Sequence, residues 1–337
     1  PARAIVFAKV GAAVYKERKR ILAQDSCIDN NMAAFIVDET RLDVRFAHYL
    51  LTAFKMSDLV AVGALPSLNG GQLRSIPMLV PPELSDQRRI AAALTDADDL
   101  IDTLGALIVK KQAIKQGLMQ QLLTGRTRLP GFTDSWRRAT LGELGAFSKG
   151  RGVKRDDVRS SGVPCIRYGE LYTDFVNYTS STRSFVSPDV AATALPIRSG
   201  DLLFAGSGET RDEIGMCVAY VGDAAAVAGG DIVILRGNGA FNAVFLATLT
   251  NLPSVATQKS HAGQGDAVVH ISSRAIGDIR VEIPSKTEQD AIADVIIDAD
   301  RELEALLARL RKARDIKAGM MQQLLTGRVR LPMETAS

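Results

Sequence analysis

The side chains of this sequence that could do chemistry are mainly basic and polar, and they gather in short segments that contain glycine. The most basic of these segments, Lys149–Arg155, combines four cations with two glycines. Lysine and arginine in such a loop can contact phosphate groups, and hydroxyl or amide groups in nearby loops can bond to base edges. These residue types therefore favour recognition of a nucleic acid, and a solvated surface loop is the alternative for Lys149–Arg155.

Sequence patterns that are typical of catalysis are missing. There is no phosphate-binding Gly-x-x-x-x-Gly-Lys motif and no (Asp/Asn)-Pro-Pro-(Tyr/Phe) motif. Asp315 and Lys317 have a nuclease-like spacing, but they fall on a predicted helix without an acidic partner nearby. His48, His261 and His270 form no metal or triad pattern. We therefore expect no catalytic residue, no metal site and no enzymatic activity of the chain by itself.

Composition sets wider limits on the protein. The 337 residues, 46% of them hydrophobic, are enough for two domain-sized cores. A net charge of +3 permits a nucleic-acid partner without demanding one. No run of 18 apolar residues occurs, so no membrane partner is expected. The three distant cysteines, Cys27, Cys165 and Cys217, favour a reducing compartment, hence a cytoplasmic location, and are expected to be small buried hydrophobes.

An internal duplication organises the chain. Residues 87–130 and 289–332 align without a gap, and their last twelve residues, MQQLLTGRTRLP and MQQLLTGRVRLP, differ at one position. A period of about 200 residues is too long for a solenoid repeat. Each unit is therefore expected to contain a globular domain and a helix.

Each copy of the repeat predicts a long helix. Apolar residues recur at alternating spacings of three and four, which is typical of a coiled-coil seam. Ser85 and Thr287 are predicted N-caps, and Gly125 and Gly327 fit the residue after each helix. The predicted seam consists of Ile90, Leu94, Ile101, Leu104, Ile108, Leu118, Leu122, Ile292, Ile296, Leu303, Leu306, Leu310, Met320 and Leu324.

The two predicted helices need a partner. A helix from Gln87 to Thr124 would be about 57 Å long at roughly 1.5 Å per residue, and it could not bury its seam alone. The economical solution is an antiparallel pair of the two helices with a domain at each end. Packing of each helix on its own domain or on another chain is the alternative.

The globular segments are predicted to contain both short strands and helices. Residues 131–283 contain short β-rich runs separated by Gly, Pro, Ser and Asp, with a helix near Ala243–Leu252. The first 86 residues repeat the later part of this segment, because Ile5–Ala8 matches Leu202–Ala205. The predicted fold class is α+β, with two domains of mixed short strands and helices separated by two long antiparallel helices that form a coiled coil.

The first domain is predicted to be incomplete. Residues from about 131 to 199 have no counterpart upstream, so the first domain would lack roughly its N-terminal half. Whether this shortening is natural stays open. The predicted boundaries are 1–84 for the partial first domain, 85–130 for the first long helix, 131–286 for the complete second domain, 287–332 for the second long helix and 333–337 for a tail.

Several motifs together resemble a known family. Both helices follow a proline and an acidic residue before glutamine, in Pro82…Asp86-Gln87 and Pro284…Glu288-Gln289. The helix end Leu118–Arg126, the stretch Leu129–Phe132 with Trp136 and Thr140–Leu144, and the segments Gly200–Phe204 and Ala228–Asp231 add to the pattern. The whole chain thereby resembles the specificity subunits of Type I restriction enzymes, and the duplicated arrangement makes this resemblance specific. The incomplete first domain departs from the family.

The resemblance implies a DNA sequence-recognition subunit of a restriction–modification system that acts in phage defence. Two target-recognition domains would each read half of a bipartite double-stranded DNA target. The helices would dock modification (adenine-N6 methyltransferase) subunits, expected to be two, and restriction (motor–nuclease) subunits would join them. S-adenosylmethionine would be bound by the modification subunits, and no cofactor by this chain. At about 3.4 Å per base pair, a helix of ~57 Å would span roughly 17 base pairs as an upper limit.

DNA contacts are expected in loops that combine cations with base-edge groups. The alternatives are a core tyrosine with a surface arginine at 167–168 and a charged hairpin tip at 16–20. In the first domain the candidates are Lys9, Lys16, Arg18, Lys19 and Arg20. In the second domain they are Arg151, Lys154, Arg155, Arg167, Tyr168, Ser207, Glu209, Thr210, Arg211, Lys259, Ser260 and Gln264.

Two further interpretations stay open. A chain with an incomplete first domain could assemble through its helices as a scaffold that does not read DNA. It could also be a half-specificity subunit that must pair with a second chain, including a second copy of itself. A hydrolase that acts alone would require a catalytic motif, which the sequence lacks.

Overall fold

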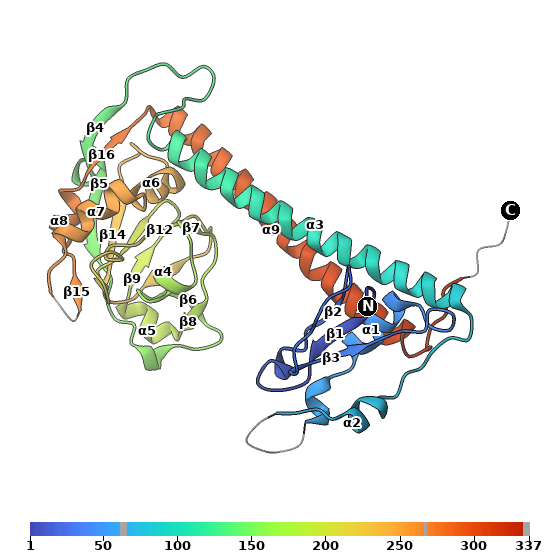
Figure 1. Cartoon of the computed structure of the whole chain (residues 1–337). Helices are drawn as coiled ribbons and strands as arrows, with labels where there is room; N and C mark the ends of the chain where they lie inside the picture. The colour runs from blue at the N-terminus through green and yellow to red at the C-terminus, as the bar shows by residue number, and fades with distance from the viewer. Residues whose placement is uncertain (61–65, 266–267, 333–337) are drawn as a thin grey trace. The chain divides into compact units, whose positions relative to one another are not determined.

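The computed structural model describes residues 1–60, 66–265 and 268–332, so the predicted tail at 333–337 lies outside the described residues. The chain forms two compact units, and both long helices contribute to each of them. Unit 1 comprises Pro1–Lys110 and Leu303–Ser337, and unit 2 comprises Lys111–Glu302. The units mix strands and helices, which confirms the predicted α+β class (Figure 1).

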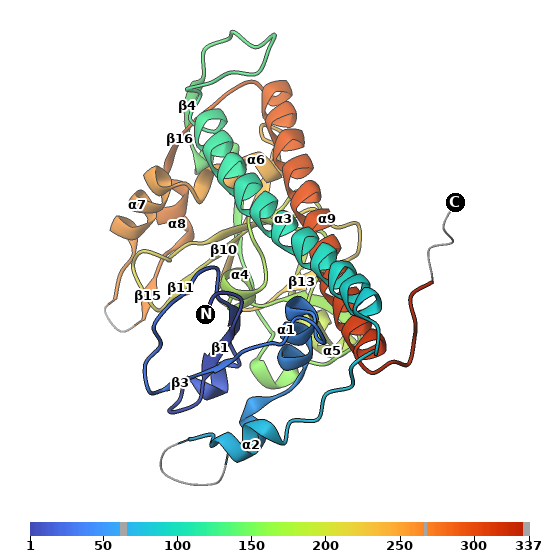
Figure 2. The same ribbon diagram turned by 45° about the vertical axis from the view of Figure 1, so that its right-hand side comes forward.

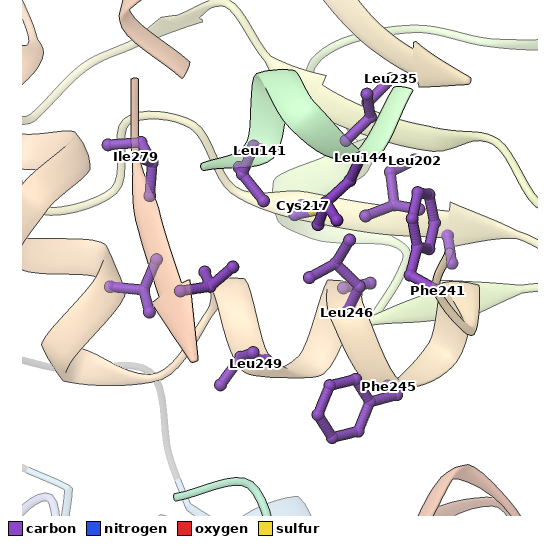
Figure 3. Packing of buried hydrophobic residues seen from close by; sticks show 14 of the residues in the cluster. Leu141, Leu144, Leu202, Cys217, Leu235, Phe241, Phe245, Leu246, Leu249 and Ile279 are labelled. Carbon is purple, nitrogen blue, oxygen red and sulfur yellow. The ribbon is translucent and has the colours of Figure 1, made fainter. Parts of the chain in front are cut away.

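Unit 2 is built around a five-stranded sheet. Its order is β5 (Gly145–Lys149), β14 (Ile232–Gly237), β10 (Leu202–Ala205), β12 (Cys217–Tyr220) and β7 (Tyr178–Thr179). The central strand β10 is antiparallel to both neighbours, and all four of its residues are buried. Helix α6 (Ala243–Thr250) packs against β12 and completes the core that Figure 3 shows around Leu202, Cys217 and Leu246.

Smaller elements of unit 2 surround this sheet. A second sheet has the order β8 (Ser184–Val186), β6 (Val163–Ile166), β13 (Ala226–Ala228) and β9 (Leu195–Ile197). Two-strand ribbons join β11 (Ser207–Gly208) to β15 (Val269–His270) and β16 (Arg280–Ile283) to β4 (Arg137–Thr140). The remaining helices are η3 (Leu141–Leu144), η4 (Arg155–Asp157), α4 (Glu170–Thr173), α5 (Pro188–Thr193), α7 (Pro253–Ala262) and α8 (Ser273–Gly277).

Unit 1 has a smaller sheet. Strand β1 (Ile5–Ala8) lies between β2 (Lys19–Ile21) and β3 (Met32–Phe35), and both pairings are antiparallel. Helix α1 (Val44–Ala53) packs against β2. Figure 2 shows α1 together with β1 and β3 from a second direction. The short helices η1 (Val14–Lys16), η2 (Met56–Leu59) and α2 (Gly70–Arg74) complete the unit. Its core includes Ile5, Phe7, Val44 and Leu51.

The duplication extends beyond the long helices to the sheets of the two units. The order β2-β1-β3 repeats the order β12-β10-β14, because the central strand comes first along the chain in both units. The backbone also repeats beyond the strands: Lys9 N donates to Asn31 O (2.8 Å) as Gly206 N donates to Asp231 O (2.7 Å). Within the described part of unit 1, no strand corresponds to β5 or β7 at the two outer positions of the sheet.

The long helices α3 (Leu84–Leu122) and α9 (Lys286–Leu324) are antiparallel in each unit. In unit 1, Asp98 pairs with Lys317, and Leu104 and Ile108 pack with Leu306 and Leu310. In unit 2, Lys115 pairs with Asp300. The predicted seam residues are all buried or half-buried. Leu122, Ile292 and Ile296 among them pack into the core of unit 2.

The ends of the long helices were predicted in part. Gly125 (φ +67°) and Gly327 (φ +66°) adopt the left-handed conformation expected after each helix. Ser85 and Thr287 are not N-caps, because both lie inside the helices. Ser285 precedes α9, and its hydroxyl accepts a 3.4 Å hydrogen bond from Glu288 N, as an N-cap side chain does.

A buried glutamine joins each long helix to its globular domain. In unit 2, Gln289 Oε1 accepts a hydrogen bond from Asn242 N (2.9 Å), and its Nε2 donates to Pro284 O (3.0 Å). In unit 1, Gln87 Oε1 accepts from Asp43 N (2.8 Å), and its Nε2 donates to Pro81 O (2.8 Å). Both glutamines are fully buried. The motif of an acidic residue before glutamine thus marks a structural joint.

Replacing Gln289 should destabilise unit 2. A Gln289→Leu variant leaves buried backbone groups without partners, so the free energy of unfolding should fall by about 2–3 kcal/mol. Urea unfolding followed by the fluorescence of Trp136, the one tryptophan of the chain, measures this change. Gln112→Leu, at an exposed position of α3, is the matched control. Equal stability of the two variants would show that the buried amide contributes nothing.

Candidate nucleic-acid interface

Several loops of unit 2 meet at one end of its main sheet. Gly150 N donates to Ile232 O (2.8 Å), which holds the loop after β5 against the start of β14. Gly229 N donates to Ile166 O (2.9 Å), and Ile271 N donates to Gly206 O (3.0 Å). These bonds gather segments 149–155, 166–169, 206–211, 229–231, 263–265 and 268–271 on one face. Segments separated by more than a hundred residues in the sequence therefore form one surface.

Close backbone contact explains the glycines of this surface. A Cβ at Gly150 would lie 2.0 Å from Gly229 O, so no other residue fits there without a shift of the backbone. Gly152 has a φ of +85°, and a Cβ there would lie 2.7 Å from Thr193 Oγ1. The glycines thus allow the basic loop to lie on the 229–231 turn, and the cations between them are held at its surface.

The cations of the basic loop are accessible. Arg151, Lys154 and Arg155 are exposed, and η4 begins at Arg155. The Lys149 side chain, which the residue-level prediction omitted, is 68% exposed and lies 3.6 Å from Asp231. Its position in the same basic run could have identified it. Four positive side chains on one glycine-packed loop create a favourable site for phosphate oxygens.

Two predicted residues at 167–168 have different roles. Tyr168 is exposed, so its ring can stack on or bond to a partner. The Arg167 guanidinium is held by the buried Glu170 carboxylate at 3.2 Å. Glu170 also accepts from Arg167 N (3.0 Å) and from the Ser184 hydroxyl. This network fixes the turn that presents Tyr168.

Arg211 braces the polar loops. Its Nη1 donates to Gly263 O (2.9 Å) and its Nη2 to Gly265 O (3.2 Å), which joins the 206–211 loop to segment 263–265. Glu209, Thr210 and Gln264 are exposed beside this brace, and Ser260 is half-buried in α7. The structure thus brings these predicted base-edge groups together at the same end of the sheet as the basic loop.

Three predicted DNA contacts are wrong, because the structure buries their side chains. Lys259 is 2% exposed, and its Nζ donates to Gly215 O (2.6 Å). Ser207 is 4% exposed, and its Oγ bonds to His270 Nδ1 (2.9 Å). Lys19 is 3% exposed; it pairs with Glu17 (2.6 Å) and donates to Phe54 O (2.9 Å). Each side chain instead has its hydrogen-bond partners inside the protein.

The matching end of unit 1 carries its own cations. Lys9 occupies the position of Gly206 at the end of the central strand, and Lys16 and Arg18 lie in the loop between β1 and β2. These two and Arg20 are exposed, and Tyr15 beside them is 57% exposed. The prediction missed Tyr15, although an aromatic residue next to a basic run could have signalled it.

Glu17 fixes this basic loop of unit 1. Its carboxylate accepts hydrogen bonds from Lys19 Nζ (2.6 Å), Met56 N (3.1 Å) and Ser57 N (2.8 Å). Burial by itself would raise the pKa of Glu17, but the hydrogen bonds outweigh it and lower the pKa to about 2. The carboxylate therefore stays ionised and tied to η2 at neutral pH.

Other candidates for chemistry have structural roles. Lys317, of the Asp315–Lys317 spacing, pairs with Asp98 and lies 5.6 Å from the centre of the Tyr49 ring. Cys165 and Cys217 are buried as predicted, whereas Cys27 is exposed against the prediction. Within the described ranges, no His, Cys, Asp and Glu side chains cluster as a metal site would, and no helix is both long and apolar enough to cross a membrane.

Comparison with known proteins agrees with the architecture. Residues 2–111 match the family model for the Type I restriction modification DNA specificity domain. The chain is also similar to curated type I specificity subunits. Two such subunits of Methanocaldococcus jannaschii, MjaX and MjaVIII, are 22% and 23% identical to it. The matches cover 89% and 79% of this chain, which spans 72% of the MjaX subunit and 65% of the MjaVIII subunit.

Solved specificity subunits share the fold. The S subunit of M. genitalium superimposes with a TM-score of 0.61 at 16% identity, over 96% of this chain and 83% of that one. The HsdS subunit of Thermoanaerobacter tengcongensis gives a TM-score of 0.52 at 16% identity, over 98% and 84% of the two chains. A structure from work on complex assembly of the type I R-M system gives 0.56 at 18% identity, over 98% and 85%. The resemblance predicted from the motifs is confirmed.

The buried Lys259 should make the stability of unit 2 depend on pH. Burial lowers the pKa of Lys259 from 10.5 to about 8. Between these values the unfolded chain binds more protons than the folded one, so the free-energy cost of burying this lysine falls as pH rises. Relative to Lys259→Met, the wild type should gain up to about 3 kcal/mol between pH 7 and 10.5, at about 1.4 kcal/mol per pKa unit.

Urea unfolding of both proteins across this pH range, followed by Trp136 fluorescence, measures the gain. The comparison with Lys259→Met cancels the titration of the tyrosines and cysteines, which both proteins share. A constant difference between wild type and variant would contradict the lowered pKa.

Proposed function

We propose that this chain is the DNA sequence-recognition subunit of a type I restriction–modification complex and reads a bipartite double-stranded target. The observation that carries the proposal is the surface of unit 2, where exposed Arg151, Lys154 and Arg155 lie on a glycine-packed loop beside Tyr168. Similarity to type I specificity subunits supports it.

The side chains of this surface would have two roles, phosphate contact and base recognition. The cations of segment 149–155 would neutralise phosphates and set affinity, because charge contacts to the backbone carry no sequence information. Tyr168, Glu209, Thr210 and Gln264 would approach base edges, where donors and acceptors distinguish base pairs. The Arg211 brace holds these polar loops in place, so the reading groups keep a fixed geometry.

The duplication supports a target in two halves. Unit 1 repeats the sheet order and presents Lys9, Lys16, Arg18 and Arg20 at the corresponding end of its sheet. Each unit would then read one half-site. A chain that assembles without reading DNA, or that reads with one unit and pairs with another copy, is an alternative that experiment can distinguish.

The long helices would provide the docking sites for the modification subunits, expected to be two, which restriction subunits would join. Exposed apolar side chains on the helices support this role: Leu100, Val109, Leu307 and Ile316 in unit 1, and Ile114 in unit 2. Such side chains favour burial against a partner. The chain would itself hold no cofactor; S-adenosylmethionine would be bound by the modification subunits.

Adenine methylation tests the function directly. The chain is co-expressed with a type I modification subunit, preferably the one encoded beside its gene, and methylated adenines are sequenced genome-wide. A split methylated motif is expected if both units read DNA. A single half-site or a palindrome would assign the reading to one unit paired with another copy. A stable complex without methylation would contradict the proposal and favour a scaffold.

The basic loop should set affinity without changing sequence preference. On a duplex that contains the methylated motif, Lys154→Ala with Arg155→Ala should weaken binding and lower the slope of log K against log salt by about 2, one unit for each lost phosphate contact. Arg137→Ala with Arg138→Ala removes the same charge from β4, at the far end of unit 2, and should leave the slope unchanged. Equal slopes for the two double variants would exclude this loop as the phosphate contact.

A further inference from the structure

A short β ribbon in the surface of unit 2 places an exposed histidine between two polar residues. Strand β11 pairs with β15, with Ser207 opposite His270. On the other side of His270, its N donates to Gln264 O (2.7 Å) and its O accepts from Gln264 N (2.9 Å). Residues that lie opposite each other in antiparallel strands have their side chains on the same face. Ser207, His270 and Gln264 therefore form a row across the ribbon.

Ser207 fixes the direction of the His270 ring. The ring is exposed, whereas Ser207 is buried and its Oγ lies 2.9 Å from His270 Nδ1. No other acceptor for this hydroxyl lies among the residues that the structure describes, and a buried O–H group needs one. The hydroxyl therefore donates to Nδ1, and a neutral ring carries its proton on Nε2. His270 thus offers a directed N–H donor to a partner.

Val268 adds an apolar group beside this donor. Val268 is 51% exposed and His270 is exposed, whereas Val269 and Ile271 are buried. Alternate residues of an extended chain face the same side, so Val268 and His270 share the outward side of this segment. Gln264 is also exposed. The ribbon therefore presents a carboxamide, an N–H donor and an apolar side chain together.

These three groups match the major-groove edge of an A·T base pair. The edge presents the adenine N7 acceptor and N6 donor, then the thymine O4 acceptor and C5 methyl group. A glutamine such as Gln264 bonds to adenine N6 and N7, an N–H donor such as His270 suits O4, and an apolar side chain such as Val268 contacts the methyl group. A G·C pair has the cytosine amino donor where thymine has O4, so it would oppose the donor of His270.

Unit 1 contains the same backbone arrangement. Leu68 N donates to Lys9 O (2.8 Å), as Ile271 N donates to Gly206 O (3.0 Å) in unit 2. Lys9 and Gly206 occupy the same position after the central strand of each sheet, so Leu68 corresponds to Ile271. The residue before each of them is therefore held at the same place in its unit.

The side chains at this place differ between the units. Ser67, which is exposed, stands at the position of His270, and its bridge partner is Val10 rather than a serine. A valine has no hydroxyl with which to orient a ring. One backbone position thus carries two different exposed side chains, as expected of a position that distinguishes two half-sites.

We infer that His270, oriented by Ser207, reads an A·T base pair in the half-site bound by unit 2, together with Gln264 and Val268. The inference rests on the proposed function, because it requires DNA on this surface. Ser207 is a positioning residue, since its hydroxyl acts through the ring. His270 and Val268 were not among the DNA contacts predicted from the sequence.

Base analogues test the contact of Val268, with the chain in complex with its modification subunit and bound to a duplex that contains the methylated motif. Each thymine of the motif is replaced in turn by uracil, which lacks only the methyl group. At one position the replacement should weaken wild-type binding about fourfold, as expected for one buried methyl group, and should not affect Val268→Ala. Val176→Ala, at a 70% exposed valine between α4 and β7, is the matched control and should respond like the wild type. Absence of such a position would overturn the inference.

Exchange of the same A·T pair for G·C tests His270 and Ser207. The exchange should weaken wild-type binding about tenfold or more. His270→Ala and Ser207→Ala should each reduce this penalty about fivefold, and the double variant should resemble His270→Ala, because the serine acts through the ring. An effect of Ser207→Ala that persists in the His270→Ala background would indicate a structural role only and would contradict the inference.

Genome-wide sequencing of methylated adenines separates this inference from the proposed function. The motif methylated with His270→Ala should accept other base pairs at one position of one half-site. A split motif that is unchanged in this variant would overturn the inference alone. Absence of methylation with the wild-type chain would overturn both. Loss of the modification subunit from the His270→Ala complex would show that the ring contacts protein rather than a base, which also overturns the inference.

Discussion

The amide group of one buried glutamine in each unit is the constraint on which the architecture depends. Gln289 joins the first turn of α9 to Asn242, which is itself the N-cap of α6. Gln87 joins α3 to Asp43, the N-cap of α1, in the same way. A buried amide without partners is costly, so the angle at which the long helix leaves the domain is tied to the helix that covers the sheet. Apolar packing alone would fix this geometry less well, because it has no direction.

The duplication also gives each unit the same ion pair between the long helices, although the tyrosine beside it differs. Lys115 with Asp300 and Lys317 with Asp98 are the same ion pair in the two units. Each aspartate also accepts from a tyrosine, Tyr178 (3.2 Å) or Tyr49 (2.9 Å), although the two tyrosines come from different places in the fold. Different parts of the chain thus supply the same contact to the aspartate of each ion pair. These pairs are partly buried, where charged groups need hydrogen-bond partners.

The sequence was sufficient for the fold class, the duplication and the antiparallel helix pair, because each depends on periodicity or on repeated letters. It was less reliable for single residues. Lys19 and Lys259 read as surface cations, yet both have a carbonyl acceptor inside the protein that only the folded chain brings near. Thr287 had the residue type of an N-cap, but the helix starts one residue earlier, at Lys286. The packing of Trp136 on Gly125 was likewise invisible in the sequence, because a loop separates them and no periodic pattern connects them.

The two hydrogen bonds from Arg211 to the carbonyls of Gly263 and Gly265 have a consequence for how this surface can change. They use backbone acceptors only, so they hold the two loops together whatever side chains stand at 209, 210 and 264. The entropy of ordering these loops is largely lost when the protein folds, and little of it remains to be lost when a ligand arrives. Substitutions at the exposed positions can therefore alter what is recognised while the loops that carry them stay in place. Because of this preorganisation, the specificity of the surface can change by substitution without a loss of its stability.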